Sequence, residues 1–383
     1  MLKKFFVSII VFFVFATPSL ADAEVLNHTN ILDRYAAGGP LKILVVPGHS
    51  DLYPGAVYGK IREADMTRQL GAKIVAELSK DPRLSATLLR DENGYKPEFL
   101  NYYLTKTAEV DDFMNSHIKS TQKAVESGEI KVSSQAAHNP VPDDIVNKLY
   151  AISKWAGEQG YDMVLNLHFN DNWPRALSAR GPYAGYSVYV PETGLSNAVE
   201  GQALGRAIAA RLENSIDKSD LPGEMRETDA TGVIESFKLI AIGAYNTLDI
   251  PSVVVEHSYI YEPWLDPQFF PLATNVLARA VSSGVEDYIL GARVDKKNLI
   301  YQWNTDIAMS ESKTTDTLAL QLALSEMGFY PPVGKTRDDC AMTGIFWNCT
   351  RDALKAFQSA RAIKPTGTFG PITRGVMNIL FAY

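Results

Sequence analysis

The sequence predicts an α/β protein with a mostly parallel sheet flanked by helices, followed by a small C-terminal three-helix module. The first part is predicted by strand-like runs that alternate with helical patterns between about residues 41 and 290. Many of these runs are rich in β-branched residues, as strands are. The module is predicted by an internal repeat near the C-terminus.

The first residues resemble a targeting segment rather than part of the fold. Lys3 and Lys4 precede an apolar run over residues 5–16, and small residues follow. This order is typical of a secretory signal peptide, which we expect to span residues 1–23. A membrane anchor is the alternative, but the run is shorter than the roughly 20 residues that a spanning helix needs. We therefore expect a secreted protein, periplasmic or extracellular, with no transmembrane anchor after cleavage.

The charge of the chain argues against a nucleic-acid partner, and its cysteines indicate a disulfide. The chain of 383 residues has a formal net charge of −7, and it shows no basic footprint for a nucleic acid. Its two cysteines, Cys340 and Cys349, lie close together in a chain that we expect to be exported, so we predict a local disulfide. A zinc site made from these two residues alone would lack ligands.

Between the signal peptide and the module, residues 24–290 form the predicted α/β domain. Its strands are predicted at "LKILVV" (41–46), "SATLLR" (85–90), "DMVLNLHF" (162–169), "GYSVYV" (185–190) and "PSVVVE" (251–256). Helical patterns are predicted at 63–78, 143–158, 199–212, 234–245 and 272–290. Residues 95–142 interrupt the alternation and are interpreted as an insertion with helices of its own, either a lid or a surface decoration.

The C-terminal part begins after a polar, aperiodic linker at residues 291–313. The segments "TGIFWNCTR" (343–351) and "TGTFGPITR" (366–374) repeat one pattern, and each precedes a helical run. A further helix is predicted at 316–327. Residues 314–383 are therefore interpreted as one small helical module.

Polar residues occur where the predicted strands end. His49 follows the first strand, at the sheet edge where ligands bind in open α/β folds, and a satisfied polar residue is the alternative. Glu63 opens the next helix on the same face as Met66 and Leu70, so it should point toward the core. A buried carboxylate needs a partner, although a charge favoured by the helix N-terminus is the simpler interpretation.

The later strands add three more candidates. His168 alternates with Asn166 and Asn170 on one face of its strand, which indicates a site or the place where the strand reaches the surface. Asn170 is a candidate substrate contact. Glu256 ends the run "SVVVE", and His257 should face the other way, as a core histidine or one that supports the site.

Together these positions place two imidazoles and two carboxylates at one edge of the sheet. Two histidines and one carboxylate with an open fourth position form a catalytic zinc shell. A second carboxylate nearby can act as a general base.

These residues resemble the zinc-dependent N-acetylmuramoyl-L-alanine amidases of the type 3 family. The likeness covers residues 41–290 and is carried by "VVPGHSDLYPGAVYGKIREADMTRQL", "LNLHFND" and "PSVVVE". It implies that His49, Glu63 and His168 bind Zn²⁺ and that Glu256 is the catalytic carboxylate. The sequence departs from the family where Ser50 and Asp51 replace glycines, where Asn166 replaces a serine, and where "HSYI" follows Glu256.

The C-terminal repeat resembles the three-helix peptidoglycan-binding module, through "LALQLALSEMGFYPP", "ALKAFQSARAI" and "TGTFGPITRGVM". The two resemblances imply a cell-wall hydrolase that cuts the bond between N-acetylmuramic acid and L-alanine, with peptidoglycan as its partner. The alternatives are a wall-binding protein that has lost activity and a zinc peptidase acting on another wall amide. The sequence does not identify an activator protein.

Overall fold

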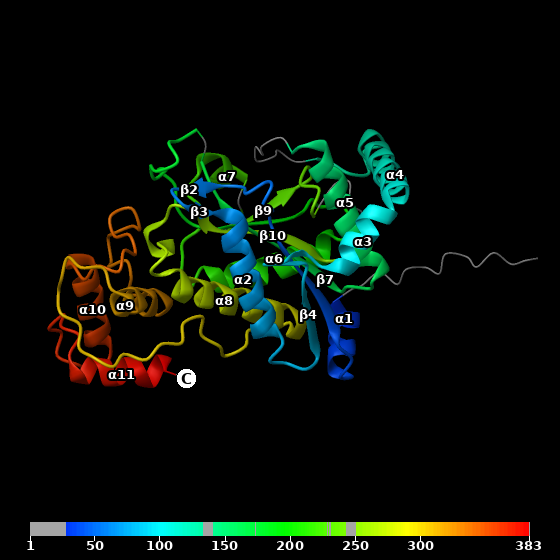
Figure 1. The fold of residues 1–383 in the computed structure, drawn as a ribbon. Helices are drawn as coiled ribbons and strands as arrows, with labels where there is room; N and C mark the ends of the chain where they lie inside the picture. The colour runs from blue at the N-terminus through cyan, green and yellow to red at the C-terminus, as the bar shows by residue number, and fades with distance from the viewer. Residues whose placement is uncertain are drawn as a thin grey trace, which may run out of the picture.

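The five predicted strands and one further strand form a six-stranded sheet in a computed structural model of the chain (Figure 1). The structure describes residues 28–132, 141–172, 174–227, 229, 231–242 and 250–382, so the predicted signal peptide lies outside it. The order across the sheet is β4 (Leu84–Leu88), β1 (Leu41–Pro47), β7 (Met163–Asn170), β10 (Ser252–Tyr259), β8 (Ser187–Pro191) and β9 (Val233–Ser236).

The prediction of a mostly parallel sheet is confirmed. Strands β4, β1, β7 and β10 run parallel, β8 is antiparallel to β10, and β9 is parallel to β8. Strands β1, β7 and β10 lie in the middle, and helices cover both faces, which explains their nearly continuous apolar sequences. Their carboxyl ends meet at one edge of the sheet.

The prediction of a helix at residues 234–245 is wrong, because residues 233–236 form the edge strand β9. Val233 packs into the main core, whereas Ile234 packs into a separate cluster with Tyr189 and Val254. Neighbouring residues therefore face opposite sides, as they do in a strand. Pairing with β8 outweighs a local pattern that also fits a helix. Residues 243–249 lie outside the described part.

One face of the sheet is covered by three long helices that the sequence predicts. They are α2 (Glu63–Leu78), α6 (Ala198–Leu212) and α8 (Phe270–Leu290), and α8 packs against both of the others. The shorter helix α1 (His28–Ala36) contacts α8 and β1 at the end of this layer.

The insertion lies on the opposite face. Its helices α3 (Pro97–Thr105) and α4 (Thr107–Glu126) pack on α5 (Asp143–Glu158), on the right of Figure 1. Phe99 and Val110 share a buried cluster with Leu44 and Val46 of β1. The described part of the insertion therefore contributes to the core and is not a surface decoration; residues 133–140 lie outside the described part.

The C-terminal module contains α9 (Thr315–Glu326), α10 (Asn348–Ala360) and α11 (Pro371–Phe381), on the left of Figure 1. The predicted disulfide between Cys340 and Cys349 is present. The remaining short elements are β2 (Val57–Tyr58), β3 (Ile61–Arg62), β5 (Arg90–Asp91), β6 (Gly94–Tyr95), α7 (Pro222–Glu227) and the 3₁₀ helix η1 (Pro263–Leu265).

Residues 291–313, all of them described, form no helix, but the segment is anchored by four buried side chains, those of Asn298, Leu299, Trp303 and Ile307. The backbone N–H groups of Asn298 and Leu299 donate to the Glu326 carboxylate of α9 at 2.8 and 3.0 Å. Trp303 is buried, with its ring 5.7 Å from that of Phe369. The Nδ2 atom of Asn298 also donates to the carbonyl of Arg211 in α6 at 2.7 Å, so this segment contacts both the module and the α/β domain. None of the helices in the described residues is long and apolar enough to cross a membrane.

Candidate metal and catalytic site

The chain turns sharply after β1 and brings His49 over the sheet edge. His49 has a φ of 64°, in the left-handed region that only a few non-glycine residues adopt. The preceding Gly48 lies against His168, because a Cβ atom at Gly48 would be 2.4 Å from that ring. A glycine at this position thus allows the two histidines to approach, with ring centroids 4.9 Å apart.

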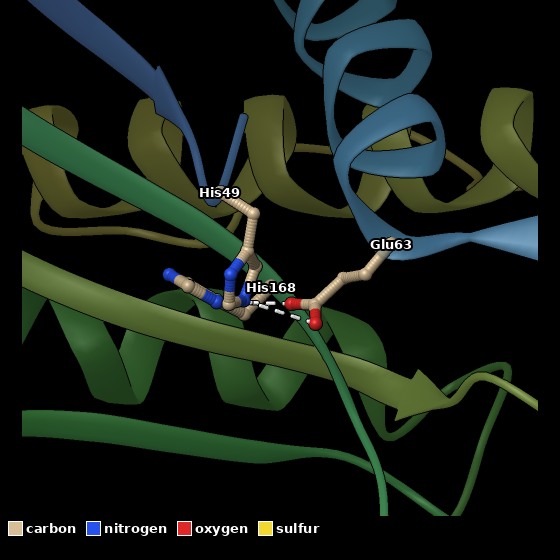
Figure 2. Close-up of side chains that lie close together, drawn as sticks. All are labelled: His49, Glu63 and His168. Atoms are coloured by element: carbon tan, nitrogen blue, oxygen red, sulfur yellow. Dashed lines mark hydrogen bonds and ion pairs between the residues drawn. The ribbon is translucent and has the colours of Figure 1, made fainter. Parts of the chain in front are cut away.

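Glu63, the first residue of α2, reaches toward both histidines from one side (Figure 2). Its Oε2 is 3.0 Å from Nε2 of His49, and its Oε1 is 3.0 Å from Nδ1 of His168. The backbone N–H groups of Ala56 and Phe169 also donate to this carboxylate, at 2.9 and 3.1 Å. The carboxylate is only 3% exposed, and these four partners meet the need of a buried charge.

The carboxylate and the imidazoles of this cluster shift one another's pKa values. Burial tends to raise the pKa of Glu63, but His49 and His168 hold that pKa well below its usual range. Burial likewise tends to lower the pKa of His49, and the Glu63 carboxylate raises it above its usual value. Glu63 is therefore ionised, as a metal ligand must be.

The three side chains fit a metal ion. One donor atom from each of His49, Glu63 and His168 lies within 4.8 Å of the other two. Two imidazole nitrogens and one carboxylate oxygen are a donor set that suits zinc. Gly55 holds the surrounding loop close, since a Cβ atom there would lie 2.4 Å from Oε2 of Glu63.

Glu256 lies across the strand ladder from this cluster. It pairs in register with His168, and both line a cavity of about 700 Å³ at the sheet edge. Its Oε2 atom is buried and has no hydrogen-bond partner among the described residues. Burial, followed by the charges of Glu63 and Glu224, raises the pKa of Glu256 well above its usual value. The cavity thus holds two carboxylates whose pKa values are shifted in opposite directions.

Glu224 is a further acidic residue of this cavity, and sequence reasoning missed it. It lies on the short helix α7, is 4% exposed, and accepts hydrogen bonds from Ser187 and Tyr189, both at 2.7 Å. Asn170, the predicted substrate contact, also lines the cavity, and its Nδ2 donates to Glu224 at 2.8 Å. No periodicity or strand end marks Glu224, because α7 lies in a polar connection.

His257 faces away from the cavity, as its place after Glu256 predicts. It is fully buried, and its Nδ1 donates to the backbone carbonyl of His168 at 3.0 Å. Burial lowers the pKa of His257 to about 4, so the ring is neutral. His257 therefore supports the strand that carries His168.

Two sequence families match this chain. The N-acetylmuramoyl-L-alanine amidase family matches residues 43–264, and a peptidoglycan binding domain matches residues 313–377. The first range contains His49, Glu63, His168 and Glu256, and the second contains all three helices of the module except the end of α11. A comparison with curated protein sequences found no match.

Several solved amidases resemble the α/β domain. The N-acetylmuramoyl-L-alanine amidase AmiC2 of Nostoc punctiforme is 17% identical, with a TM-score of 0.40 over 66% of this chain and 98% of that chain. The CwlD amidase from Clostridioides difficile, in complex with the GerS lipoprotein, is 14% identical, with a TM-score of 0.41 over 65% and 98% of the two chains. Ami1 from Mycobacterium smegmatis is 11% identical, with a TM-score of 0.43 over 66% and 97%.

The family match extends over residues 43–264, which is more than half of the 383 residues. A peptidoglycan binding domain follows it, so both parts of the chain act on the same polymer. The chain therefore belongs to the N-acetylmuramoyl-L-alanine amidase family and is a peptidoglycan amidase.

Proposed function

We propose that this chain is a zinc-dependent amidase with Glu256 as its general base. The reaction is hydrolysis of the amide bond between the lactyl group of N-acetylmuramic acid and L-alanine. The observation that carries the proposal is the convergence of two imidazoles and a carboxylate with a separate, unpartnered carboxylate at one cavity. Such a set can bind a metal on one side and move a proton on the other.

His49, Glu63 and His168 would hold the ion. When bound, zinc supplies Lewis acidity, which polarises the amide carbonyl and makes water more acidic. The backbone N–H groups of Ala56 and Phe169 fix the carboxylate, and the ring nitrogens that contact it at 3.0 Å would turn to the ion once deprotonated.

Glu256 would move the proton. Its raised pKa makes the ionised carboxylate a stronger base than an exposed glutamate, and its Oε2 has no competing partner among the described residues. The carboxylate takes a proton from the attacking water and then delivers it to the amine of L-alanine as the amide bond breaks. Asn170, on the wall of the same cavity, is the proposed substrate contact.

We further propose that residues 1–23 direct export, so that the enzyme meets its substrate in the periplasm or outside the cell. The disulfide between Cys340 and Cys349 supports this location, since such bonds persist in oxidising compartments.

The test is digestion of purified peptidoglycan by the full mature chain, followed by mass analysis of the fragments. We expect stem peptides with a free L-alanine amine and glycan strands with unsubstituted lactyl groups. A cut inside the stem peptide would identify a peptidase acting on another amide. Wall binding without any cut would identify a binding protein and overturn the proposed chemistry.

A further inference from the structure

The C-terminal module is docked on the amidase domain at a second place besides the packed linker. Ser325 of α9 donates to the carbonyls of Asn214 and Ser215, at 3.3 and 3.2 Å. At the same interface, Nε of Arg337 lies 3.4 Å from Oδ1 of Asp217. The two parts are therefore held in one relative position, and a space between them is a feature of the fold.

A cavity of about 380 Å³ lies at this interface, apart from the metal cluster. Three amidase segments line it, at residues 180–185, 216–220 and 261–264, and the module contributes residues from 336 to 342. Residues 174–185 lie between the two cavities, because Leu177 lines the catalytic one and Arg180 lines this one. A polymer bound at the catalytic cavity is thus close enough to reach the second.

The lining carries unsatisfied charge of both signs. Arg180 and Asp338 are exposed at the cavity and form no ion pair or hydrogen bond with the described residues. Nη1 of Arg337 is buried and has no partner among the described residues. Burial, followed by the charge of Asp338, raises the pKa of Asp220 despite a hydrogen bond from the N–H of Ala184. A ligand that brought one cation and one anion would satisfy both sides of this cavity.

Tyr183 and Tyr261 add aromatic surface to the same lining. Aromatic side chains can pack on the backbone of a bound peptide and on the aliphatic parts of its side chains, while charged groups of the protein bind the charged groups of the peptide. A polyanion is disfavoured by Asp220 and Asp338, and a purely apolar ligand would leave Arg180 and the Nη1 atom of Arg337 without a partner.

We propose that this cavity binds a zwitterionic peptide segment of the wall polymer, with its carboxylate at Arg180 and Arg337 and its ammonium group at Asp338 and Asp220. The proposal rests on the proposed function, since peptidoglycan stem peptides supply such segments wherever a diamino acid is not cross-linked. Bound here, an uncleaved stem peptide would anchor the polymer while another stem occupies the catalytic cavity.

The test measures binding of the synthetic tripeptide N-acetyl-L-Ala–γ-D-Glu–L-Lys to the full mature chain by calorimetry. The tripeptide carries two carboxylates and, on its lysine, one free amine, and it has no muramic acid bond to cleave. Arg180→Gln and Asp338→Asn should each raise its Kd by about tenfold, the expected loss of one charge-assisted contact. Lys119→Gln and Asp112→Asn on α4, which remove the same charges on the opposite face of the sheet, should leave the Kd unchanged.

A second probe tests the orientation. When the lysine amine of the tripeptide is acetylated, Asp338→Asn should have no further effect on the Kd, whereas Arg180→Gln should still weaken binding. Wild-type affinity in both cavity variants, or an equal effect of Asp338→Asn on both peptides, would overturn the proposal. If the chain failed to cut peptidoglycan but showed this pattern, the proposed function would fail and the cavity assignment would stand. Cleavage of the muramic acid bond, together with tripeptide binding that neither variant changes, would support the proposed function and overturn the cavity assignment.

Discussion

Gly55 gives a sharp test of the metal cluster, because its substitution acts on the cluster without changing any ligand. Gly55 has a φ of 72°, and a Cβ atom there would lie 2.4 Å from Oε2 of Glu63 and 2.5 Å from Cδ2 of His49. Real Cβ atoms essentially never approach closer than 3.0 Å, so Gly55→Ala must displace Glu63, His49 or the loop by more than half an ångström. A displacement approaching 1 Å costs on the order of 100-fold in rate.

Gly59→Ala is the matched control for the backbone. Gly59 has a φ of 60°, so an alanine there has the same left-handed strain of about 1–2 kcal/mol. Its Cβ atom would meet nothing within 4 Å. Gly59→Ala therefore measures the loss of thermal stability from backbone strain alone, and Gly55→Ala should lose at least as much, because it adds the clash with Glu63 and His49.

Only Gly55→Ala should lose metal and activity. The assay combines metal analysis of the purified variants, melting temperature, and cleavage of soluble muropeptides. Equal metal content and turnover in Gly55→Ala and Gly59→Ala would refute the argument that this loop holds the Glu63 carboxylate in place.

Three other predictions address the base, its neighbour and the module. Glu256→Gln should keep the bound metal and the fold but lower turnover by about 10²–10⁴-fold, the usual value of a positioned base; wild-type turnover would remove Glu256 from the mechanism. Glu256 acts as a base only when ionised, so activity should fall as pH drops through its pKa, which burial and then the charges of Glu63 and Glu224 raise. Glu224→Gln removes one of those charges and should move the acidic limb of the pH–rate profile to lower pH, and an unmoved limb would contradict this coupling. Removing residues 314–383 should weaken binding to insoluble wall. It should also lower the free energy of unfolding of the remaining chain by at least about 2 kcal/mol, because Trp303 loses its contact with Phe369 and becomes exposed to solvent. An unchanged melting temperature after truncation would show that the docking contacts contribute nothing to stability.

The sequence predicts the central sheet well because its central strands are covered on both faces. Apolar runs such as Leu41–Pro47 have only one way to be buried next to helices of matching periodicity. The candidate site follows from the same reasoning: polar residues that end parallel strands must meet at one edge, as His49, His168 and Glu256 do.

What the sequence does not reveal depends on long-range contacts. The stretch from Val233 has helical and strand character, and only pairing with β8 decides between them. Glu224 gives no signal because its partners, Ser187 and Tyr189, lie far from it in the chain. The insertion looks polar, yet its few apolar residues, such as Phe99, complete the second face of the sheet.

The packed linker changes how the module should act on the reaction. A flexible tether only raises the effective concentration of catalytic domain near its substrate. Here Asn298 of the linker and Ser325 of the module bond to residues 211–215 of the α/β domain and fix the module, so wall polymer bound to it meets the catalytic cavity in a constant orientation. Contacts at the module do not change as the amide bond breaks, because they lie away from the reacting atoms. They therefore stabilise the bound substrate and the transition state equally, which lowers KM for the polymer and leaves kcat unchanged.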